Sequence, residues 1–256
     1  MKNTILLILV FLLYFNQSHS QKLLDFNEKI SSYDISSLYV ESTSPEKYSD
    51  ITIDKVEPIG FFGENFQRFY VHMISIVQNN NDPLEYYVYG KSKLKQKISS
   101  FSGKMKITKC QILDEEDVAN CRRGFVTLKY EFFEDKLNGG TGKFIGTCQS
   151  SFFIDDENKI FYDAIYLYAD SFDNNQFEGN WVSYSSDKSY KCNWGDFRIP
   201  GSEELDTGTG EFKVLKKYLN NGWKSYQYAK GYGYESEVSR EEIEAAESLE
   251  KEEWWK

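Results

Sequence analysis

Eight segments between Phe66 and Ile199 carry hydrophobic residues in strand-like patterns, and this feature constrains the fold most. Short separators rich in Asn, Asp, Gly and Ser divide the segments, and these residue types favour turns. The predicted strands are Phe66–Val77, Tyr86–Lys95, Ser100–Ile112, Arg123–Phe133, Lys143–Ile154, Lys159–Ala169, Phe177–Ser185 and Tyr190–Ile199. The sequence therefore predicts an all-β fold, a single antiparallel barrel or closed sandwich of about eight to ten strands with a short C-terminal helix.

The remaining chain divides around this region. Residues 1–20 have the pattern of a signal peptide, because the apolar run Ile5–Phe15 follows a basic start and small residues precede a cut near Ser20. As a helix this run would span about 16 Å, which is too short for a membrane anchor. We expect a lead-in over 21–50, an antiparallel β domain over 51–235 and an acidic helix or tail over 236–256. The expected protein is secreted, periplasmic or extracellular, and does not span a membrane.

The C-terminal segment has the capping-box pair Ser239 and Glu242, so it is predicted to begin as a helix. A lone helix of this length is marginal in water. It is expected either to dock through Ile243, Leu249 and Trp254, which is the favoured alternative, or to form a mobile tail.

Four cysteines follow the predicted cut. An even number of cysteines in an exported protein favours disulfides, and three connectivities are possible. Cys110–Cys121 is favoured because the residues between them have the composition of a hairpin tip, which leaves Cys148–Cys192 by elimination. A zinc site needs close-spaced cysteine pairs, which are lacking. No metal or cofactor is expected.

A short pattern recurs on three predicted strands, in which Phe, Gly and a third bulky residue alternate. It occurs at Phe101-Gly103-Met105, Phe144-Gly146-Cys148 and Phe177-Gly179-Trp181. Alternate residues of a strand share one face, and glycine there indicates a bend or a group passing close to the backbone.

The F-x-G-x-W sequence of Phe177 to Trp181 resembles the strand signature of the calycin barrels, the lipocalin and avidin group. That resemblance implies a structural role for Phe177, Gly179 and Trp181, with Trp181 at the closed end of a barrel and a basic side chain, here Arg198, covering it. Lipocalins carry the signature on the first barrel strand, whereas here it lies near the end of the β region. Trp194 shares a predicted strand face with Asp196 and Arg198, which suggests a structural ion pair.

The composition bears on partners. The formal net charge of −10 disfavours nucleic acid and anionic lipid. His72 is the only histidine after the cut, which excludes sites that need two imidazoles. Its alternation with Tyr70, Ile74 and Ile76 places it in their apolar layer. Aromatic residues are abundant, and we expect a barrel interior with ligand-binding residues His72, Tyr162, Tyr166 and Trp181.

Three functions remain open. The first is an exported, non-enzymatic barrel that holds a small, mostly apolar or planar ligand in its interior, with no catalytic residue. The alternative is a surface interaction protein that displays the acidic helix and aromatic loops to an extracellular protein or glycan; the loop tyrosines are Tyr226, Tyr228, Tyr232 and Tyr234. A minor alternative is a hydrolase that uses carboxylates such as Asp196 or Asp206.

Overall fold

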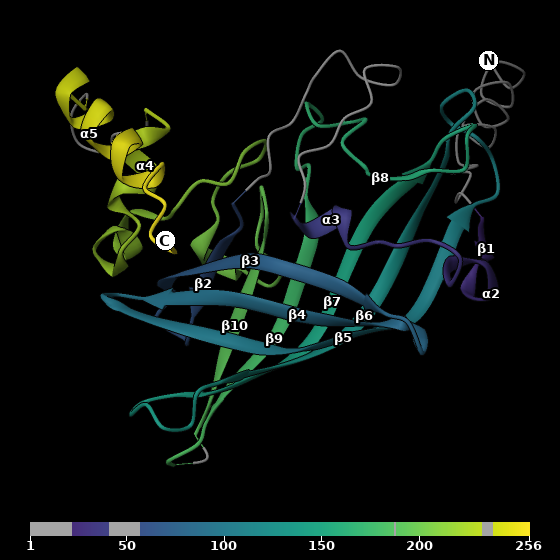
Figure 1. The fold of residues 1–256 in the computed structure, drawn as a ribbon. Coiled ribbons are helices and arrows are strands. Elements are labelled where there is room, and N and C mark those ends of the chain that lie inside the picture. The colour runs from purple at the N-terminus through teal and green to yellow at the C-terminus, as the bar shows by residue number, and fades with distance from the viewer. Residues whose placement is uncertain (1–21, 41–56, 187, 232–237) are drawn as a thin grey trace, which may run out of the picture.

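Eight antiparallel strands form a closed ring in chain order (Figure 1). The computed structural model describes residues 22–40, 57–186, 188–231 and 238–256. The ring strands are β2 (Ile59–Phe62), β3 (Gln67–Asn79), β4 (Asp82–Leu94), β5 (Lys97–Leu113), β6 (Arg122–Glu134), β7 (Gly142–Ile154), β9 (Asn174–Ser183) and β10 (Ser189–Asp196). β10 pairs with β2 and closes the ring. Two short strands lie beside it, β1 (Leu23–Asp25) on β5 and β8 (Ile160–Tyr162) on β7. The predicted antiparallel barrel is confirmed.

The predicted strand Lys159–Ala169 is the exception, because the strand ends at Tyr162. Asp163 explains the break. Its Oδ1 accepts a hydrogen bond from the Ile165 backbone N–H at 3.1 Å, and its Oδ2 accepts one from Arg123 Nε at 2.7 Å. An aspartate that bonds the backbone two residues on favours a turn over an extended strand. The remaining ring position is taken by β2, where the sequence pattern is weak.

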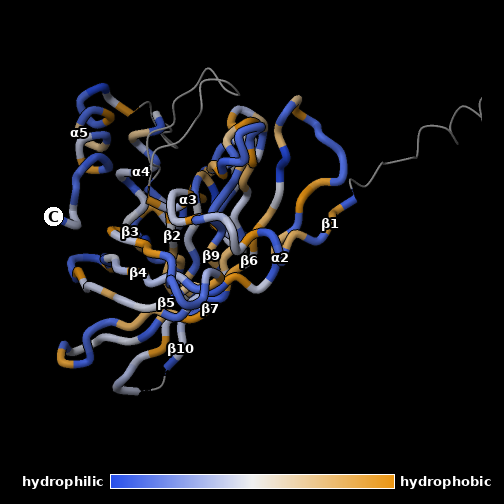
Figure 2. Tube along the Cα trace, turned by 45° about the vertical axis from the view of Figure 1, so that its right-hand side comes forward, coloured by the Kyte–Doolittle hydropathy of each residue, from blue (hydrophilic) through white to orange (hydrophobic). Residues whose placement is uncertain are grey.

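The inward-facing side chains fill the ring with aromatic groups. Phe69, Phe101, Phe132, Phe144, Phe177 and Trp194 are each at most 3% exposed. Phe177 stacks on Trp194 with ring centroids 4.8 Å apart. Hydrophobic and hydrophilic positions interchange along the ring strands in Figure 2, as expected for strands with one face inward.

An N-terminal segment covers the end of the ring where β9 begins. It contains α2 (Asn27–Ile30) and α3 (Ser37–Val40), and it adds Phe26, Ile30, Ile35, Leu38 and Tyr39 to the core. Tyr39 Oη accepts a hydrogen bond from Ser150 Oγ at 3.0 Å, and the Leu38 carbonyl accepts one from Asn175 Nδ2 at 2.9 Å. The lead-in is therefore part of the fold.

A second hydrophobic cluster lies outside the ring. The outward side chains of β2, Ile59 and Phe61, pack there against the chain that follows β10. That part of the chain includes the 3-10 helices η1 (Glu203–Leu205) and η2 (Lys216–Asn221), followed by α4 (Lys224–Ala229) and α5 (Arg240–Glu250). It contributes Ile199, Leu205, Phe212, Val214, Tyr218 and Trp223 to the cluster.

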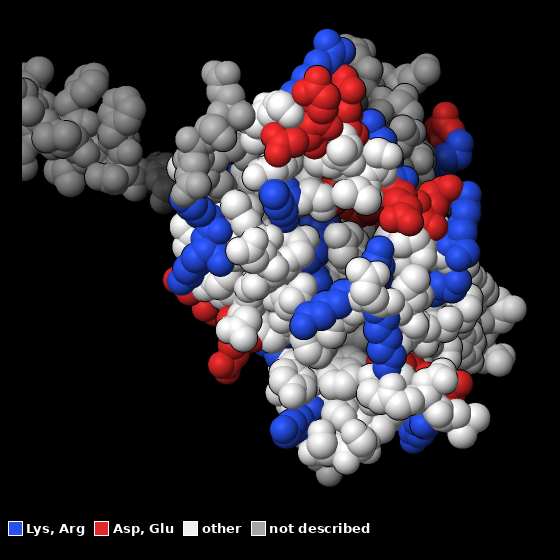
Figure 3. All heavy atoms as spheres, turned by 90° about the vertical axis from the view of Figure 1, so that its left-hand side faces the viewer, with Lys and Arg blue, Asp and Glu red and all other residues white. Residues whose placement is uncertain are grey.

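The C-terminal helix is confirmed, with the predicted capping box of Ser239 and Glu242. It packs against α4, but Leu249 is 62% exposed and Ala246 is the buried residue of α5. The anchor is Glu250, which bonds Arg68 at 3.2 Å and Ser225. Figure 3 shows many of the acidic side chains of this face gathered in its upper part, with Lys and Arg side chains above, beside and below them.

No disulfide forms: Cys110, Cys121, Cys148 and Cys192 are all free and buried, and the predicted pairing is wrong. Cys110 lies opposite Val126, so Cys121 is five residues away, about 16 Å along the strand. Cys148 on β7 and Cys192 on β10 are separated by β9, which puts their backbones about 10 Å apart. A disulfide needs Cα atoms within about 7 Å.

Candidate functional site

Two of the four predicted ligand residues lie on the outer face of the barrel. A bulge between Met73 and Ser75 reverses the alternation of side chains along β3. His72, before the bulge, therefore faces outward, whereas Ile76, after it, faces the core. The His72 imidazole stacks on Trp255, and its Nδ1 lies 2.9 Å from Oε1 of Glu57. Tyr166 is 45% exposed and lies under the Arg123 guanidinium.

The other two predicted ligand residues lie at opposite ends of the ring. Tyr162 donates a hydrogen bond to Asp196 Oδ2 at 3.1 Å beside the start of β9, and burial, followed by the charge of Asp196, raises its pKa well above the usual value. Trp181 is near the other end of β9 and donates its indole N–H to Glu134 Oε2 at 2.8 Å. Asn174, which pairs with Asp196, and Trp181 are seven residues apart, about 23 Å. The structure therefore does not bring the four residues to one place.

The residues of the calycin-like signature contact other side chains and backbone groups of the barrel. Phe177 lies in the core. Gly179 pairs with Gly146, and the Tyr130 hydroxyl lies so close to both that a Cβ on either glycine would clash with it. This confirms the expected close approach over the glycines. Arg198 contacts Asp206 and the carbonyls of Gly208 and Gly210 instead of Trp181. Trp181 is covered by an acid, Glu134, because Arg198 follows the far end of β10.

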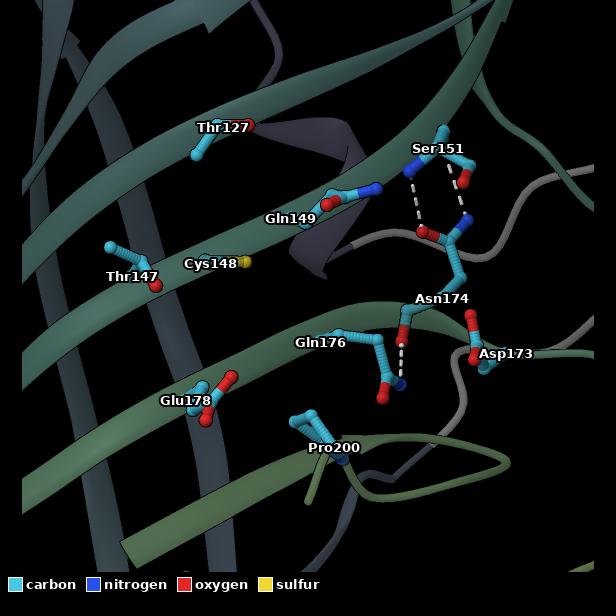
Figure 4. A pocket seen from close by; sticks show the side chains of 10 residues that line it. All are labelled: Thr127, Thr147, Cys148, Gln149, Ser151, Asp173, Asn174, Gln176, Glu178 and Pro200. Carbon is cyan, nitrogen blue, oxygen red and sulfur yellow. Dashed lines mark hydrogen bonds between the residues drawn. The ribbon is translucent and has the colours of Figure 1, made fainter.

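A polar groove on the outer face of β6, β7 and β9 is the candidate site (Figure 4). The registers explain how it forms, because Thr127 lies opposite Gln149 on the neighbouring strand, and Gln149 lies opposite Gln176. Side chains of cross-strand pairs share a face, so these strands present a row of hydroxyl and amide groups outward. The groove is lined by Thr127, Thr147, Cys148, Gln149, Ser151, Asp173, Asn174, Gln176, Glu178 and Pro200.

Two of the lining side chains hold the groove in shape. The Asn174 side chain accepts from the Ser151 N–H at 2.7 Å and donates to the Ser151 carbonyl at 3.0 Å, which extends the β7–β9 ladder. Gln176 Nε2 donates to the carbonyls of Asn174 at 2.9 Å and Arg198 at 3.0 Å, which fixes the wall containing Pro200. These bonds give the groove rigid sides.

The other polar side chains of the groove are free to bind. Among the described residues, none offers a hydrogen-bond partner to the side chains of Thr127, Thr147, Gln149, Ser151, Asp173 and Glu178. Of the residues that the structure describes, no Lys, Arg or His lines the groove. Although Asp173 is an exposed residue, surrounding protein atoms displace water from its carboxyl and raise its pKa, opposed by the charge of Arg198. The groove therefore suits a neutral or cationic polar ligand.

The two carboxylates of the groove are placed at its opposite ends (Figure 4). Glu178 lies four residues along β9 from Asn174, about 13 Å, and Asp173 precedes Asn174. Paired carboxylates of glycoside hydrolases lie about 5 to 9.5 Å apart, so this pair does not fit that chemistry. The carboxylates proposed for a hydrolase are also engaged: Asp196 accepts from Tyr162 and Asn175, and Asp206 from Arg198 and two backbone N–H groups.

The sequence did not single out this groove. Its residues are outward positions of predicted strands, where Thr, Gln and Glu are ordinary, and only the register brings them side by side. Of the surface tyrosines expected to meet a partner, Tyr226 and Tyr228 are half-buried, and Tyr232 and Tyr234 lie outside the described residues.

The described ranges have neither a metal-binding cluster nor a membrane-spanning helix. Over these residues no cluster of three or more His, Cys, Asp or Glu side chains is arranged to hold a metal ion. A helix with the length and hydrophobicity to cross a membrane is likewise missing from the described part of the chain.

Comparison of the chain with protein-family models, curated proteins and solved structures finds no match.

Proposed function

We propose that this chain is an exported, non-enzymatic binding protein that uses the outer groove of a calycin-like barrel to bind a hydroxyl-rich ligand such as a glycan. The observation that carries the proposal is the set of six polar side chains that line one groove and have no hydrogen-bond partner in the described part of the chain. Buried polar groups normally have partners, and surface groups gathered in a hollow with free hydrogen-bonding capacity favour a polar ligand.

The chemistry of these side chains supports the ligand class. Thr hydroxyls and Gln amides both donate and accept hydrogen bonds, and ionised carboxylates only accept. A ligand with several hydroxyl groups can satisfy all three types at once. Anionic ligands are disfavoured by Asp173 and Glu178, and a mainly apolar ligand would leave the free polar groups unpaired.

A glycan panel tests this proposal. Isothermal titration would use neutral gluco-, xylo-, manno- and chito-oligosaccharides with the secreted chain. We expect one family to bind, and the Gln149→Ala and Thr147→Val variants to weaken binding about tenfold each by removing one or two hydrogen bonds. Ser102→Ala, at an exposed position on β5, is the matched control and should bind normally. Absence of binding to every family would overturn the proposal.

A second candidate function is the binding of a small ligand inside the barrel. It is favoured by two buried polar groups in the core, Tyr130 Oη and Trp194 Nε1, which have no hydrogen-bond partner among the described residues. An occupant with acceptor atoms beside these two groups would give each of them a partner. Mass spectrometry of the protein from its own compartment tests this: an extra native mass lost on denaturing supports an occupant, and a bare native mass excludes one. The denatured mass should match a chain that starts at Gln21, as expected for an exported protein.

A further inference from the structure

A second recess lies beside the polar groove. Five of its twelve lining residues are aromatic, and Asp170, Arg198, Glu211 and Lys230 add charged groups at its walls. It is formed by the chain around Leu167–Phe172, the residues after β10 and the C-terminal layer. Tyr168, Phe172, Phe197 and Tyr226 line it, and Tyr168 is 80% exposed. The rings of Phe172 and Phe197 meet edge to face with centroids 5.1 Å apart. The recess therefore presents ring surfaces where the groove presents hydrogen-bonding groups.

The groove and the aromatic recess share one wall. Phe172 lines the recess and the next residue, Asp173, lines the groove. In the chain that follows β10, Arg198 lines the recess and Pro200 lines the groove. Gln176 in the groove bonds the carbonyl of Arg198, so the two hollows are adjacent parts of one surface.

This shared wall is rigid. The Arg198 guanidinium bonds the Asp206 carboxylate and donates to the carbonyls of Gly208 at 3.1 Å and Gly210 at 2.7 Å. Phe197 has a φ of 63°, a left-handed conformation that is uncommon for a bulky residue. Such conformations cost free energy, persist only where the surroundings impose them, and gather at ligand-binding sites.

We infer that the groove and the aromatic recess are two subsites for a single extended ligand, an oligosaccharide chain longer than two units. The inference rests on the proposed function and specifies its ligand. Hydroxyl groups of one part of the chain bond Thr147, Gln149 and Glu178. The apolar faces of other sugar units stack on the rings of Tyr168 and Phe197, since an aromatic ring offers a flat apolar surface with a negative face to C–H groups.

Chain length gives the test. Titration calorimetry would use the oligosaccharide family that binds in the panel, from one to six units. We expect the association constant to rise about tenfold or more between the shortest and longest chains, because the longer ones gain the stacking contacts. Tyr168→Ala should remove most of this gain and leave the shortest binding chain unaffected. Tyr168 is too exposed for its loss to disturb the fold.

Phe197→Ala should act in the same way as Tyr168→Ala, and Tyr89→Ala, an exposed tyrosine on β4, is the matched control. An affinity independent of chain length, unchanged by Tyr168→Ala yet weakened by Gln149→Ala, would overturn the two-subsite inference and leave the proposed function standing. Absence of binding to any family would overturn both.

Discussion

The indole of Trp255 stacks on the imidazole of His72, with ring centroids 3.8 Å apart and 6° between the ring planes. This contact joins the last residues of the chain to the outer face of β3. Trp254 meets Tyr70 beside it, and Lys91 donates a hydrogen bond to the Trp255 carbonyl. The C-terminal segment therefore docks through its two tryptophans and through α5, which contributes Glu250 and the buried Ala246.

We predict that Trp255→Ala lowers the free energy of unfolding by about 1–2 kcal/mol, because it removes a stacked aromatic pair and some buried apolar area. Urea denaturation gives this value, and limited proteolysis should release the C-terminal segment faster. Leu249→Ala is the control, since Leu249 is exposed on α5 and should change neither measurement. Equal effects of the two variants would contradict docking through Trp255.

Gly146→Ala should destabilise the barrel by about 3 kcal/mol or more, at the upper end of the cost of overpacking. A Cβ at Gly146 would lie 2.1 Å from the Glu178 carbonyl oxygen and 2.7 Å from Tyr130 Oη. Gly139→Ala is the matched control, because nothing lies within 4 Å of a Cβ there. Thermal unfolding of the two variants checks this; a Gly146→Ala protein as stable as the parent would show that the strands can separate to make room.

Tyr130→Phe should leave the stability of protein refolded from urea unchanged or raise it by about 1 kcal/mol, since the removed hydroxyl is buried and no described residue bonds it. Tyr86→Phe is the matched variant. The Tyr86 hydroxyl accepts from Gln78 Nε2 at 3.0 Å and donates to the Tyr33 carbonyl at 3.3 Å, so its loss should cost about 1–2 kcal/mol. Urea denaturation compares the two. A larger loss for Tyr130→Phe would mean that its hydroxyl has a partner in solution.

Stability should fall as the pH rises above about 9. Burial raises the pKa of Cys110 from 9.0 to about 12, and burial raises that of Tyr86 from 10.0 to about 12. Between the unfolded and the folded pKa of each group, the unfolded chain releases a proton that the folded chain keeps, so the free energy of unfolding falls as the pH rises. Below about pH 9 both states keep these protons, and the two groups leave the free energy of unfolding independent of pH. Cys110→Ala should make the fall of the free energy of unfolding with pH less steep, by up to about 1.4 kcal/mol per pH unit. Urea denaturation at pH 8 to 11 tests this, and identical slopes would contradict it.

All four cysteines should react with a thiol reagent only after denaturation, because burial raises the pKa of each thiol and keeps it protonated. Counting thiols in native and denatured protein, without reductant, checks this. Fewer than four reactive thiols in the denatured chain would indicate a disulfide.

Local pattern was sufficient for much of the barrel. Strands such as β6 and β7 alternate inward apolar and outward polar residues, so their existence and approximate bounds follow from sequence. The predicted strand Lys159–Ala169 is too long because Tyr162 to Ala169 is apolar enough for a strand. The strand ends at Tyr162 because Asp163 bonds the Ile165 backbone N–H and Arg123. His72 was assigned to the core because a single-residue bulge reverses the faces of β3, which alternation cannot reveal.

The candidate site was less predictable for a related reason. Thr147 and Glu178 are far apart in sequence and become neighbours through the β7–β9 register, which depends on the whole ring. The predicted disulfides failed because an even number of cysteines indicates an oxidising compartment but gives no distance between the cysteines. The strand register places Cys110 far from Cys121. Sequence therefore located the strands, whereas the contacts between them determined the surface.

The join between β2 and β10 has a consequence for the order of folding. β2 is only four residues long, and it pairs with β3 on one side and with the last ring strand on the other. Ribosomes make the chain from its N-terminus, so the hairpins from β3 to β7 can form early, whereas the final contact must wait until residue 196 has emerged. Such long-range contacts cost loop-closure entropy before they are rewarded, and they slow folding. The chain would thus stay incompletely folded during synthesis, which is the state that a protein needs if it is to be threaded through a translocation channel.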